Sequence, residues 1–356
     1  MALTLPSDLV RAIENLLTKQ FSLRLSDGRS LAEHVKRLSD YYLKFPYATT
    51  PWQEKWCQIA QLVYFLPLNY LRIQAAWSRL PWKLDVLPVS QWTDVGCGLS
   101  PMGWYLHLNS LIKDVRLFLY DHDPIPLKML RLMGLPFQQM KQPNWATEPK
   151  SSHGASFTFV LTELEKDEQR DKWHKGLWQF PFLFIVEPGL QHDGRYLLKI
   201  REEALKNNYF VLAPCTHHQP CPLKQHSKTD WCHDRVLISI PEWMKELQHY
   251  LPFKNHSLTF SYLILTTLPA LKNHYESTVL SASKARVIGD TLNLKGKIQQ
   301  AVCWNDTRSF LTYLKRDINS QAILTDLTRG QIIDIPSSMT VQGTKERLEL
   351  RLKSTK

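Results

Sequence analysis

Hydrophobic residues recur every three to four positions over the first 84 residues of the chain. The helical period is clearest in two stretches, one with Leu9, Ile13, Leu16 and Leu17 and one with Leu31, Val35, Leu38 and Tyr42. This period is typical of amphipathic helices that bury one face. The sequence therefore predicts a helical N-terminal region over residues 1–84. Its large aromatic side chains are expected to pack between the helices, namely Trp52, Trp56, Tyr64 and Tyr70.

From about residue 85 the pattern changes to short apolar runs separated by polar or helical stretches. One of these helical stretches is 194–208. Alternation of this kind is typical of an α/β domain with a mostly parallel sheet, which we expect over residues 85–280. The expected strands are 90–95, 115–120, 157–161, 182–186, 209–213 and 258–265.

After about residue 281 the apolar runs become shorter and lose the intervening helices. The pieces 286–288, 297–303, 309–314 and 331–335 predict a small β domain over residues 281–340. The last residues, 341–356, include TKERLELRLKSTK and are predicted to form a charged, mobile tail.

The charge balance adds a prediction about partners. The chain has 44 Lys and Arg against 33 Asp and Glu, a net charge of +11. This excess favours a polyanionic partner such as nucleic acid, although a merely basic enzyme remains an alternative. The N-terminus has no secretory cleavage site, and the most apolar stretch, 62–68, is far shorter than the roughly 20 residues that span a bilayer. We therefore expect a cytoplasmic chain with no membrane partner and with reduced cysteines. We also expect the chain to be monomeric.

A glycine-containing turn follows the first expected strand, in WTDVGCGLSPMGWYL. Asp94, Gly96 and Gly98 end the strand and enter a helix, where glycines allow a ligand to approach the backbone. Asp121 ends the next strand and is placed to accept ribose hydroxyls, and Glu163 follows a later strand. The third glycine of a dinucleotide motif is absent, which favours S-adenosylmethionine, a cofactor without phosphate, over NAD. A structural turn without a ligand remains the alternative.

Three of the six cysteines lie close together in APCTHHQPCPLKQHSKTDWCH. Cys215, Cys221 and Cys232 occupy a polar loop, 214–234, without an apolar period that would bury them. Such a loop indicates a metal centre that needs at least one more ligand. Neighbouring histidines are possible substitutes, although histidines in a polar loop are more often solvated; they are His217, His218, His226 and His233. Cys57 and Cys97 are expected to be small packed residues.

Several segments of this half follow a known family pattern. They are VEPGLQHDGRYLLKIREEAL, YFVLAPCTHHQPCPL, DWCH and FSYLILTT. In these segments the chain resembles the methyltransferase-like family of small ribosomal subunit assembly, whose mitochondrial members bind the maturing subunit. The resemblance covers most of residues 85–305. It implies a class I S-adenosylmethionine methyltransferase fold, Rossmann-like, that carries a 4Fe-4S cluster. The cluster ligands that it implies are Cys215, Cys221, Cys232 and Cys303.

The resemblance has departures, and it leaves the metal open. Thr216 replaces a proline, Asp234 replaces a phenylalanine, and the glycine-rich turn ends in Ser100 and Pro101. Four thiolates suit either an iron–sulfur cluster or structural zinc. Five residues separate Cys215 from Cys221 and ten separate Cys221 from Cys232. This wrap is looser than that of zinc knuckles and favours the cluster, in a structural or iron-sensing role, with zinc or no metal as alternatives.

Two functions are compatible with these features. The first is an rRNA-binding, methyltransferase-like protein of small ribosomal subunit assembly, for which the fold does not itself imply methyl transfer. The second is an active methyltransferase on a small-molecule or protein substrate, with a structural metal and no RNA partner. LTEL stands where an Asn-Pro-Pro-Tyr motif would follow the fourth strand, which favours a binding role or an unrecognised methyl acceptor. The expected phosphate contacts are Arg286, Lys295, Lys297, Arg308, Lys315 and Arg316.

Overall fold

The computed structural model describes residues 3–45, 48–80, 88–109, 115–141, 152–164, 176–278, 283–316, 327–335, 339–344 and 347–352. The chain divides into two compact units. The first comprises 1–77, 83–186 and 237–258, and the second comprises 78–82, 187–236 and 259–356. The boundaries of these units differ from those of the predicted domains. The N-terminal helices belong with the first strands, and the cysteine loop belongs with the C-terminal β region.

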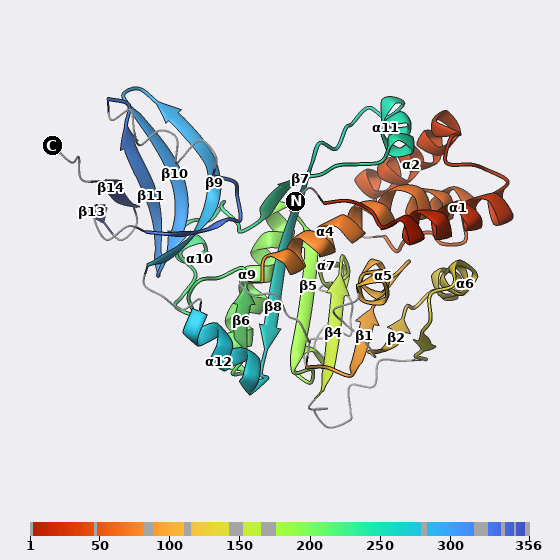
Figure 1. The fold of residues 1–356 in the computed structure, drawn as a ribbon, viewed down its shortest axis with the longest axis horizontal. Helices are drawn as coiled ribbons and strands as arrows, with labels where there is room; N and C mark the ends of the chain where they lie inside the picture. Colours follow the sequence, from red (N-terminus) through yellow and green to blue (C-terminus); the bar gives the residue numbers. More distant parts are fainter. Residues whose placement is uncertain are drawn as a thin grey trace. The chain divides into compact units, whose positions relative to one another are not determined.

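The helical prediction for the N-terminal region is confirmed. Its elements are α1 (Ser7–Phe21), α2 (Gly28–Lys44), α3 (Lys55–Ala60), the π-helical turn η1 (Gln61–Phe65) and α4 (Leu66–Ser78). Helix α11 (Glu242–His249) packs against α2 in the same unit (Figure 1). The contact is close, because a Cβ atom on Gly28 would lie 3.2 Å from Cγ of Glu246. The predicted apolar faces are buried except at Tyr42, which is half-buried, and all four predicted packing aromatics are buried.

The π-helical turn has a local cause. Pro67, at the second position of α4, has no N–H, and its ring excludes the preceding turn from regular α geometry. The helix accommodates this by widening at η1 and then continues as α4. Trp77 near the end of α4 packs against Trp92 and Phe184, with ring centroids 6.3 Å and 5.4 Å away. The long helix is thereby held on the sheet of the first unit.

The sheet of the first unit is parallel. Its strands are β1 (Gln91–Val95), β2 (Arg116–Tyr120), β3 (Gln138–Gln139), β4 (His153–Thr158) and β5 (Phe182–Pro188), in the order β3-β2-β1-β4-β5. The connecting helices are α5 (Pro101–Leu108), α6 (Pro124–Met133) and α7 (Leu161–Leu164). The predicted strand at 157–161 is misplaced. Strand β4 starts earlier, at His153, and its first residues lack the apolar run that the prediction relied on. Gly154 must stay small there, because a side chain would overlap the ring of Trp92.

The second unit continues with α9 (Gln191–Lys206), β6 (Phe210–Ala213), α10 (Pro222–His226), β7 (Asp234–Leu237), β8 (Ser257–Thr266) and α12 (Pro269–Thr278). Strand β8 pairs with β6 in antiparallel fashion and also pairs with β7. A parallel run β3-β2-β1-β4-β5 followed by an antiparallel β8–β6 pair is the strand arrangement of class I methyltransferases. The predicted fold class, α/β with a class I methyltransferase-like sheet and an added C-terminal β region, is confirmed.

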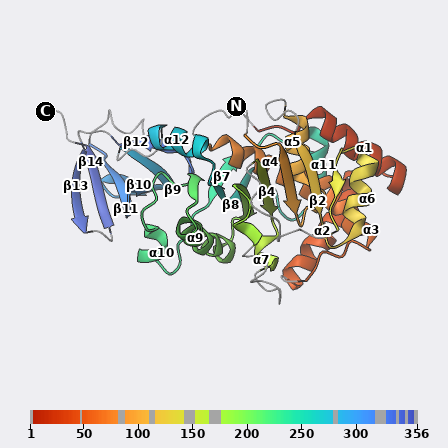
Figure 2. The same ribbon diagram turned by 90° about the horizontal axis from the view of Figure 1, so that it is seen from below.

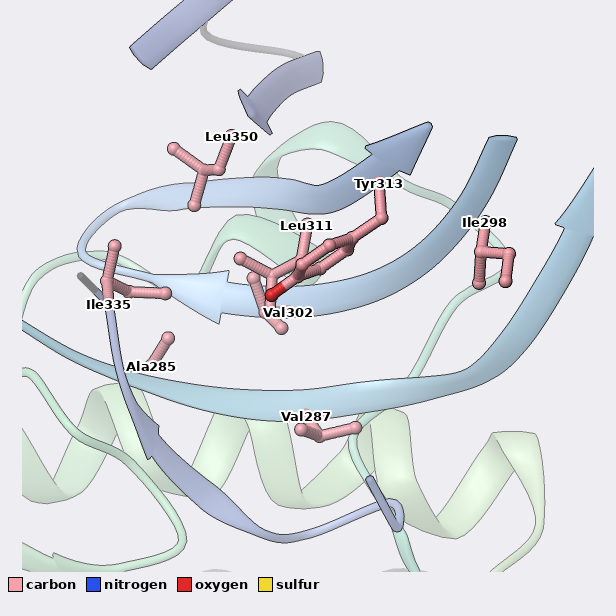
Figure 3. Close-up of a cluster of buried hydrophobic side chains, with 8 residues drawn as sticks. All are labelled: Ala285, Val287, Ile298, Val302, Leu311, Tyr313, Ile335 and Leu350. Carbon is pink, nitrogen blue, oxygen red and sulfur yellow. The ribbon is translucent and has the colours of Figure 1, made fainter. Parts of the chain in front are cut away.

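The C-terminal sheet has the order β12-β9-β10-β11-β14-β13 (Figures 1 and 2). Its strands are β9 (Lys284–Leu294), β10 (Lys297–Trp304), β11 (Thr307–Leu314), β12 (Ile332–Asp334), β13 (Met339–Thr344) and β14 (Arg347–Leu352). One buried apolar cluster holds it together (Figure 3), formed by Ala285, Val287, Ile298, Val302, Leu311, Tyr313, Ile335 and Leu350.

The predicted mobile tail is wrong for the described residues 341–344 and 347–352, which lie in β13 and β14. In RLELRL the leucines alternate with charged residues, and Leu350 is fully buried in the cluster of Figure 3. Alternation with period two is the mark of a strand with one buried face. Among the described residues, no helix has the length and apolar character needed to cross a bilayer.

Candidate cofactor loop and cysteine cavity

The predicted cofactor turn lies where the strand order of the first unit reverses. Strand β1 is flanked by β2 and β4, so the loop after β1 opens at the switch point, where open α/β sheets bind ligands. The backbone of this loop is left-handed at Gly96 (φ 60°) and Gly98 (φ 50°). A side chain on Gly96 would overlap Val160. The two glycines therefore allow a tight turn close to the segment after β4.

Asp94, at the end of β1, holds this loop through hydrogen bonds inside the protein. Its carboxylate is fully buried and accepts hydrogen bonds from Ser100 Oγ at 2.7 Å and Ser156 Oγ at 2.5 Å. Burial raises the pKa of Asp94 to about 7, although both serine hydrogen bonds act in the opposite direction. Both carboxylate oxygens are thus engaged inside the protein. Asp94 holds the turn in shape, whereas sequence reasoning predicted it as a cofactor-binding residue.

Asp121 lies at the end of β2 and faces the glycine turn. Its Oδ2 accepts the Gly98 N–H at 2.8 Å, and its Oδ1 accepts the Asp123 N–H at 3.0 Å. The side chain is 6% exposed. The hydrogen bond from His122 to Asp121 is the main cause that raises the pKa of His122. The carboxylate is therefore pre-oriented beside the turn, where hydroxyl groups of a ligand would find an acceptor.

Glu163 lies on α7 at the same edge of the first unit. Its side chain is exposed, and it is within electrostatic range of Asp121 and His122. Sequence reasoning missed a contribution from the segment before α3. A Cβ atom on Gly98 would lie 3.5 Å from the Trp52 ring, and Gln53 Nε2 donates to Asp123 Oδ2 at 3.4 Å. Trp52 was predicted only as a packing residue. Nothing in the residue spacing of the sequence indicated that it lies beside the turn.

The four cysteines predicted as metal ligands line one cavity of the second unit. Cys215 follows β6, Cys221 precedes α10, Cys232 precedes β7, and Cys303 lies on β10. Cys221 belongs to a buried apolar cluster with Leu198, Leu223, Ile288, Ala301 and Phe310, and Cys232 and Cys303 pack against this cluster. Burial raises the pKa of Cys232 to about 11, and it also raises the pKa values of Cys221 and Cys303. Without a cation these three thiols stay protonated at neutral pH.

The cavity does not have the geometry of a single-ion site. Among the described residues, no group of three or more His, Cys, Asp or Glu could hold one metal ion. Tetrahedral zinc with Zn–S bonds of about 2.3 Å requires sulfurs about 3.8 Å apart. Four cysteine thiols that line one cavity are the donor type of an iron–sulfur cluster.

The neighbouring histidines do not behave alike. His217 is buried, so the expectation of a solvated side chain is wrong for this residue. Its Nε2 lies 3.3 Å from Cys303 Sγ, and burial, followed by the charge of Arg201, lowers the pKa of His217 to about 4. His218 stacks on Tyr275, with ring centroids 5.6 Å apart. His217 is therefore a neutral group that contacts one of the four cysteines.

Cys57 and Cys97 are buried in the first unit, as predicted. Of the predicted phosphate contacts, three are paired with acids. Arg286 is buried against Asp234, Lys297 binds Glu349, and Arg308 binds Asp230. Arg286 is therefore a structural residue, and its prediction as a phosphate contact is wrong because the carboxylate of Asp234 already holds its charge.

The other three predicted phosphate contacts gather at one end of the C-terminal sheet. Lys295, Lys315 and Arg316 are exposed. The N–H of Lys315 donates to the carbonyl of Gly296 at 3.0 Å, which brings the end of β11 beside the turn between β9 and β10. We call these three residues the basic tip.

Comparison with known proteins gives one family match. Residues 151–317 match the family described as "Mitochondrial small ribosomal subunit Rsm22". The matched part includes all four cysteines of the cavity and excludes the turn between β1 and α5. No curated protein matches the chain.

Among solved structures, the chain is similar to an rRNA methylase from Escherichia coli, with 14% identity, a TM-score of 0.34 and coverage of 73% of this chain and 100% of that chain. It is also similar to the 16S rRNA methylase ArmA, with 14% identity, a TM-score of 0.33 and coverage of 65% and 97%. A third is an O-methyltransferase of neocarzinostatin biosynthesis in complex with S-adenosylmethionine, with 10% identity, a TM-score of 0.32 and coverage of 68% and 71%. At these identities no substrate carries over to this chain.

Proposed function

We propose that this chain is a methyltransferase-like protein of small ribosomal subunit assembly that binds rRNA, S-adenosylmethionine and an iron–sulfur cluster. The observation that carries the proposal is the family match over residues 151–317, whose description names the mitochondrial small ribosomal subunit. The match contains every cysteine that lines the cavity of the second unit. The proposed role in subunit assembly therefore rests on residues 151–317, which contain the four cysteines of the cavity.

The proposed adenosylmethionine site is the turn after β1. Gly96 and Gly98 allow the tight, left-handed turn that ends beside Asp121, and Asp121 would supply an acceptor for ribose hydroxyls. Asp94 keeps the turn in shape, and Glu163 lies exposed at the same edge. The bound cofactor would supply an electrophilic methyl group. The residues of this chain bind and orient it, whether or not a methyl acceptor follows.

The proposed 4Fe-4S ligands are Cys215, Cys221, Cys232 and Cys303. The first three belong to one loop, and the fourth comes from β10 of the C-terminal sheet. A cluster bound by all four would hold that sheet on the cysteine loop, so metal binding would contribute to the folding of the second unit. Four protein thiolates leave no open iron, which supports a structural or iron-sensing role over a catalytic one.

The proposed RNA contact is the basic tip, formed by Lys295, Lys315 and Arg316. Their side chains are exposed at one end of the sheet, and the chain has a net charge of +11. Neutralising one phosphate releases counterions and gives a slope of log K against log salt of about −0.9 on duplex and −0.7 on single strands. Three phosphates at the basic tip would therefore contribute a slope between about −2 and −3.

Gradient sedimentation of cell lysate, combined with crosslinking and sequencing of bound RNA, tests this function. We expect co-migration with small-subunit precursors at low salt and release as salt rises. Replacing the three tip residues by glutamine should weaken RNA binding and flatten the salt slope, whereas Arg308→Gln, a paired arginine of the same sheet, should change both less. Sedimentation as a free monomer at every salt concentration, together with methylation of a protein or small molecule, would establish the free-enzyme function instead.

A further inference from the structure

Arg201 is a buried arginine in the wall of the cysteine cavity. It lies on α9 and is 1% exposed. Its Nε donates to Cys215 Sγ at 3.1 Å. Its Nη2 donates to the carbonyls of His217 and Gln219 at 3.0 Å and 2.9 Å. The guanidinium is therefore fixed against the cysteine loop, with one N–H directed at a sulfur.

The charge of Arg201 has no acidic partner in the described part of the chain. Its contacts there are one thiol and two backbone carbonyls, and its Nη1 is buried without any hydrogen-bond partner. The other buried arginine of this unit, Arg286, has the carboxylate of Asp234 beside it. A guanidinium removed from water is unfavourable unless a negative charge lies close by. Thiolates bound to metal would provide that charge beside Arg201.

We propose that Arg201 compensates the negative charge of the metal–thiolate group in this cavity through its hydrogen bond to Cys215 and thereby sets the reduction potential of that group. The inference rests on the proposed iron–sulfur cluster and adds a role that the ligands alone do not have. Reduction adds a negative charge to the cluster, and a fixed positive charge beside it favours that state. Hydrogen bonds to ligand sulfurs and local charge are recognised determinants of cluster potential. Removing the charge should therefore make the potential more negative.

Arg195 offers a matched control on the same helix. Its Nη1 donates to the carbonyls of Ser227 and Asp230 at 3.0 Å and 2.9 Å. It therefore also holds the cysteine loop through backbone carbonyls, without a bond to sulfur. A change in potential or iron content that Arg201→Gln shares with Arg195→Gln comes from the loop. A change that occurs in Arg201→Gln alone comes from the lost charge.

The experiment compares wild type, Arg201→Lys, Arg201→Gln and Arg195→Gln, each purified without oxygen as the full chain. The readouts are iron per chain and the midpoint potential from a spectroscopic redox titration. For Arg201→Gln we expect at least a tenfold shift of the redox equilibrium toward the oxidised form, which is about 59 mV for one electron. Arg201→Lys, which keeps the charge, and Arg195→Gln should stay near the wild-type potential.

Each outcome decides a different point. If Arg201→Gln binds iron with the wild-type potential, the inference is refuted and the cluster stands. If Arg201→Gln loses iron, the result for Arg201→Lys decides. Iron retained by Arg201→Lys supports the role of charge, whereas iron lost from both variants refutes it and points to loop geometry. A wild-type protein that binds no iron refutes the proposed cluster itself, and the inference with it.

Discussion

Asp234 is the carboxylate on which two arginines of the second unit depend. It is fully buried at the start of β7, and it accepts hydrogen bonds from Arg79 Nε at 2.9 Å and from Arg286 on β9. Arg286 is 3% exposed and also donates to Tyr262 Oη at 3.2 Å and to the carbonyl of Gly330 at 3.1 Å. Asp234→Asn would keep the shape of this site and remove its negative charge.

The expected loss of stability follows from burial. Breaking a buried ion pair by removing one partner costs about 3 to 5 kcal/mol, because the other charge is left without compensation. Arg79 is partly exposed and can turn toward water, so the cost arises mainly from Arg286. The asparagine retains one acceptor oxygen, which places the expected loss near the lower end, at about 3 kcal/mol.

Asp230 provides the control for this prediction, since it lies on the same segment and also binds an arginine of the C-terminal sheet. Arg308 Nη1 and Asp230 Oδ2 are 2.7 Å apart, but the two side chains are 33% and 38% exposed. Asp230→Asn should therefore cost no more than about 1 kcal/mol. Urea denaturation, followed by fluorescence and near-ultraviolet circular dichroism, measures both variants. Equal losses for Asp234→Asn and Asp230→Asn would refute the argument from burial.

Further outcomes are expected at four positions. Because burial raises the pKa of Asp94 from 3.8 to about 7, the folded state holds this proton more tightly than the unfolded state. Wild type should therefore lose stability relative to Asp94→Asn as pH rises from about 4 to about 7, and a constant difference between the two denaturation series would contradict this. Asp121→Ala should weaken adenosylmethionine binding by roughly 1 to 3 kcal/mol, and calorimetry that finds equal affinity would move the ribose acceptor elsewhere. Cys221→Ser should lose iron and visible absorption, while Cys57→Ser, at a buried cysteine of the first unit, should keep both. Gly330→Ala should lower the thermal midpoint, because the glycine has φ 92° and a side chain there would overlap the Asp234 carboxylate; an unchanged midpoint would show that the turn can move away.

Much of the fold could be predicted because the core strands are continuous apolar runs. Strands β5 and β8 are buried along nearly their whole length, and the predicted strands at 182–186 and 258–265 coincide with them. Prediction was least accurate at β4, where Gly154 must stay small beneath Trp92. It also failed at β14, which was predicted as part of a mobile tail because of its charged residues. Leucines alternate with those charges, and Leu350 among them is buried. In both strands, packing against a neighbour decides the structure, and that neighbour is far away in the sequence.

The two candidate sites differ in how many of their residues the sequence could predict. Spacing and strand ends indicated the turn at Gly96 and Gly98 with Asp121 beside it, because the ends of parallel strands meet at one edge. The metal hypothesis for the cysteine loop followed from its polar composition, and Cys303 was added by the family resemblance. Nothing in the local pattern indicated Arg201. A charged residue on an amphipathic helix is normally solvated, and this one is buried only because the loop after β6 folds over it.

Buried charge gives the C-terminal sheet an unusual dependence on the cysteine loop. Cys221 and Leu223 pack with Ile288, Ala301 and Phe310 of the sheet, so apolar contact accounts for part of the attachment. A second contribution is the buried pair of Arg286 on β9 with Asp234 at the start of β7. Arg201 binds only the loop side, through Cys215 and two backbone carbonyls. If the cavity holds the proposed cluster, we expect removal of the metal to weaken the attachment of the sheet, because Cys303 of β10 then no longer shares the cluster with the cysteine loop. Chelation should accordingly increase proteolysis within residues 283–352 in wild type.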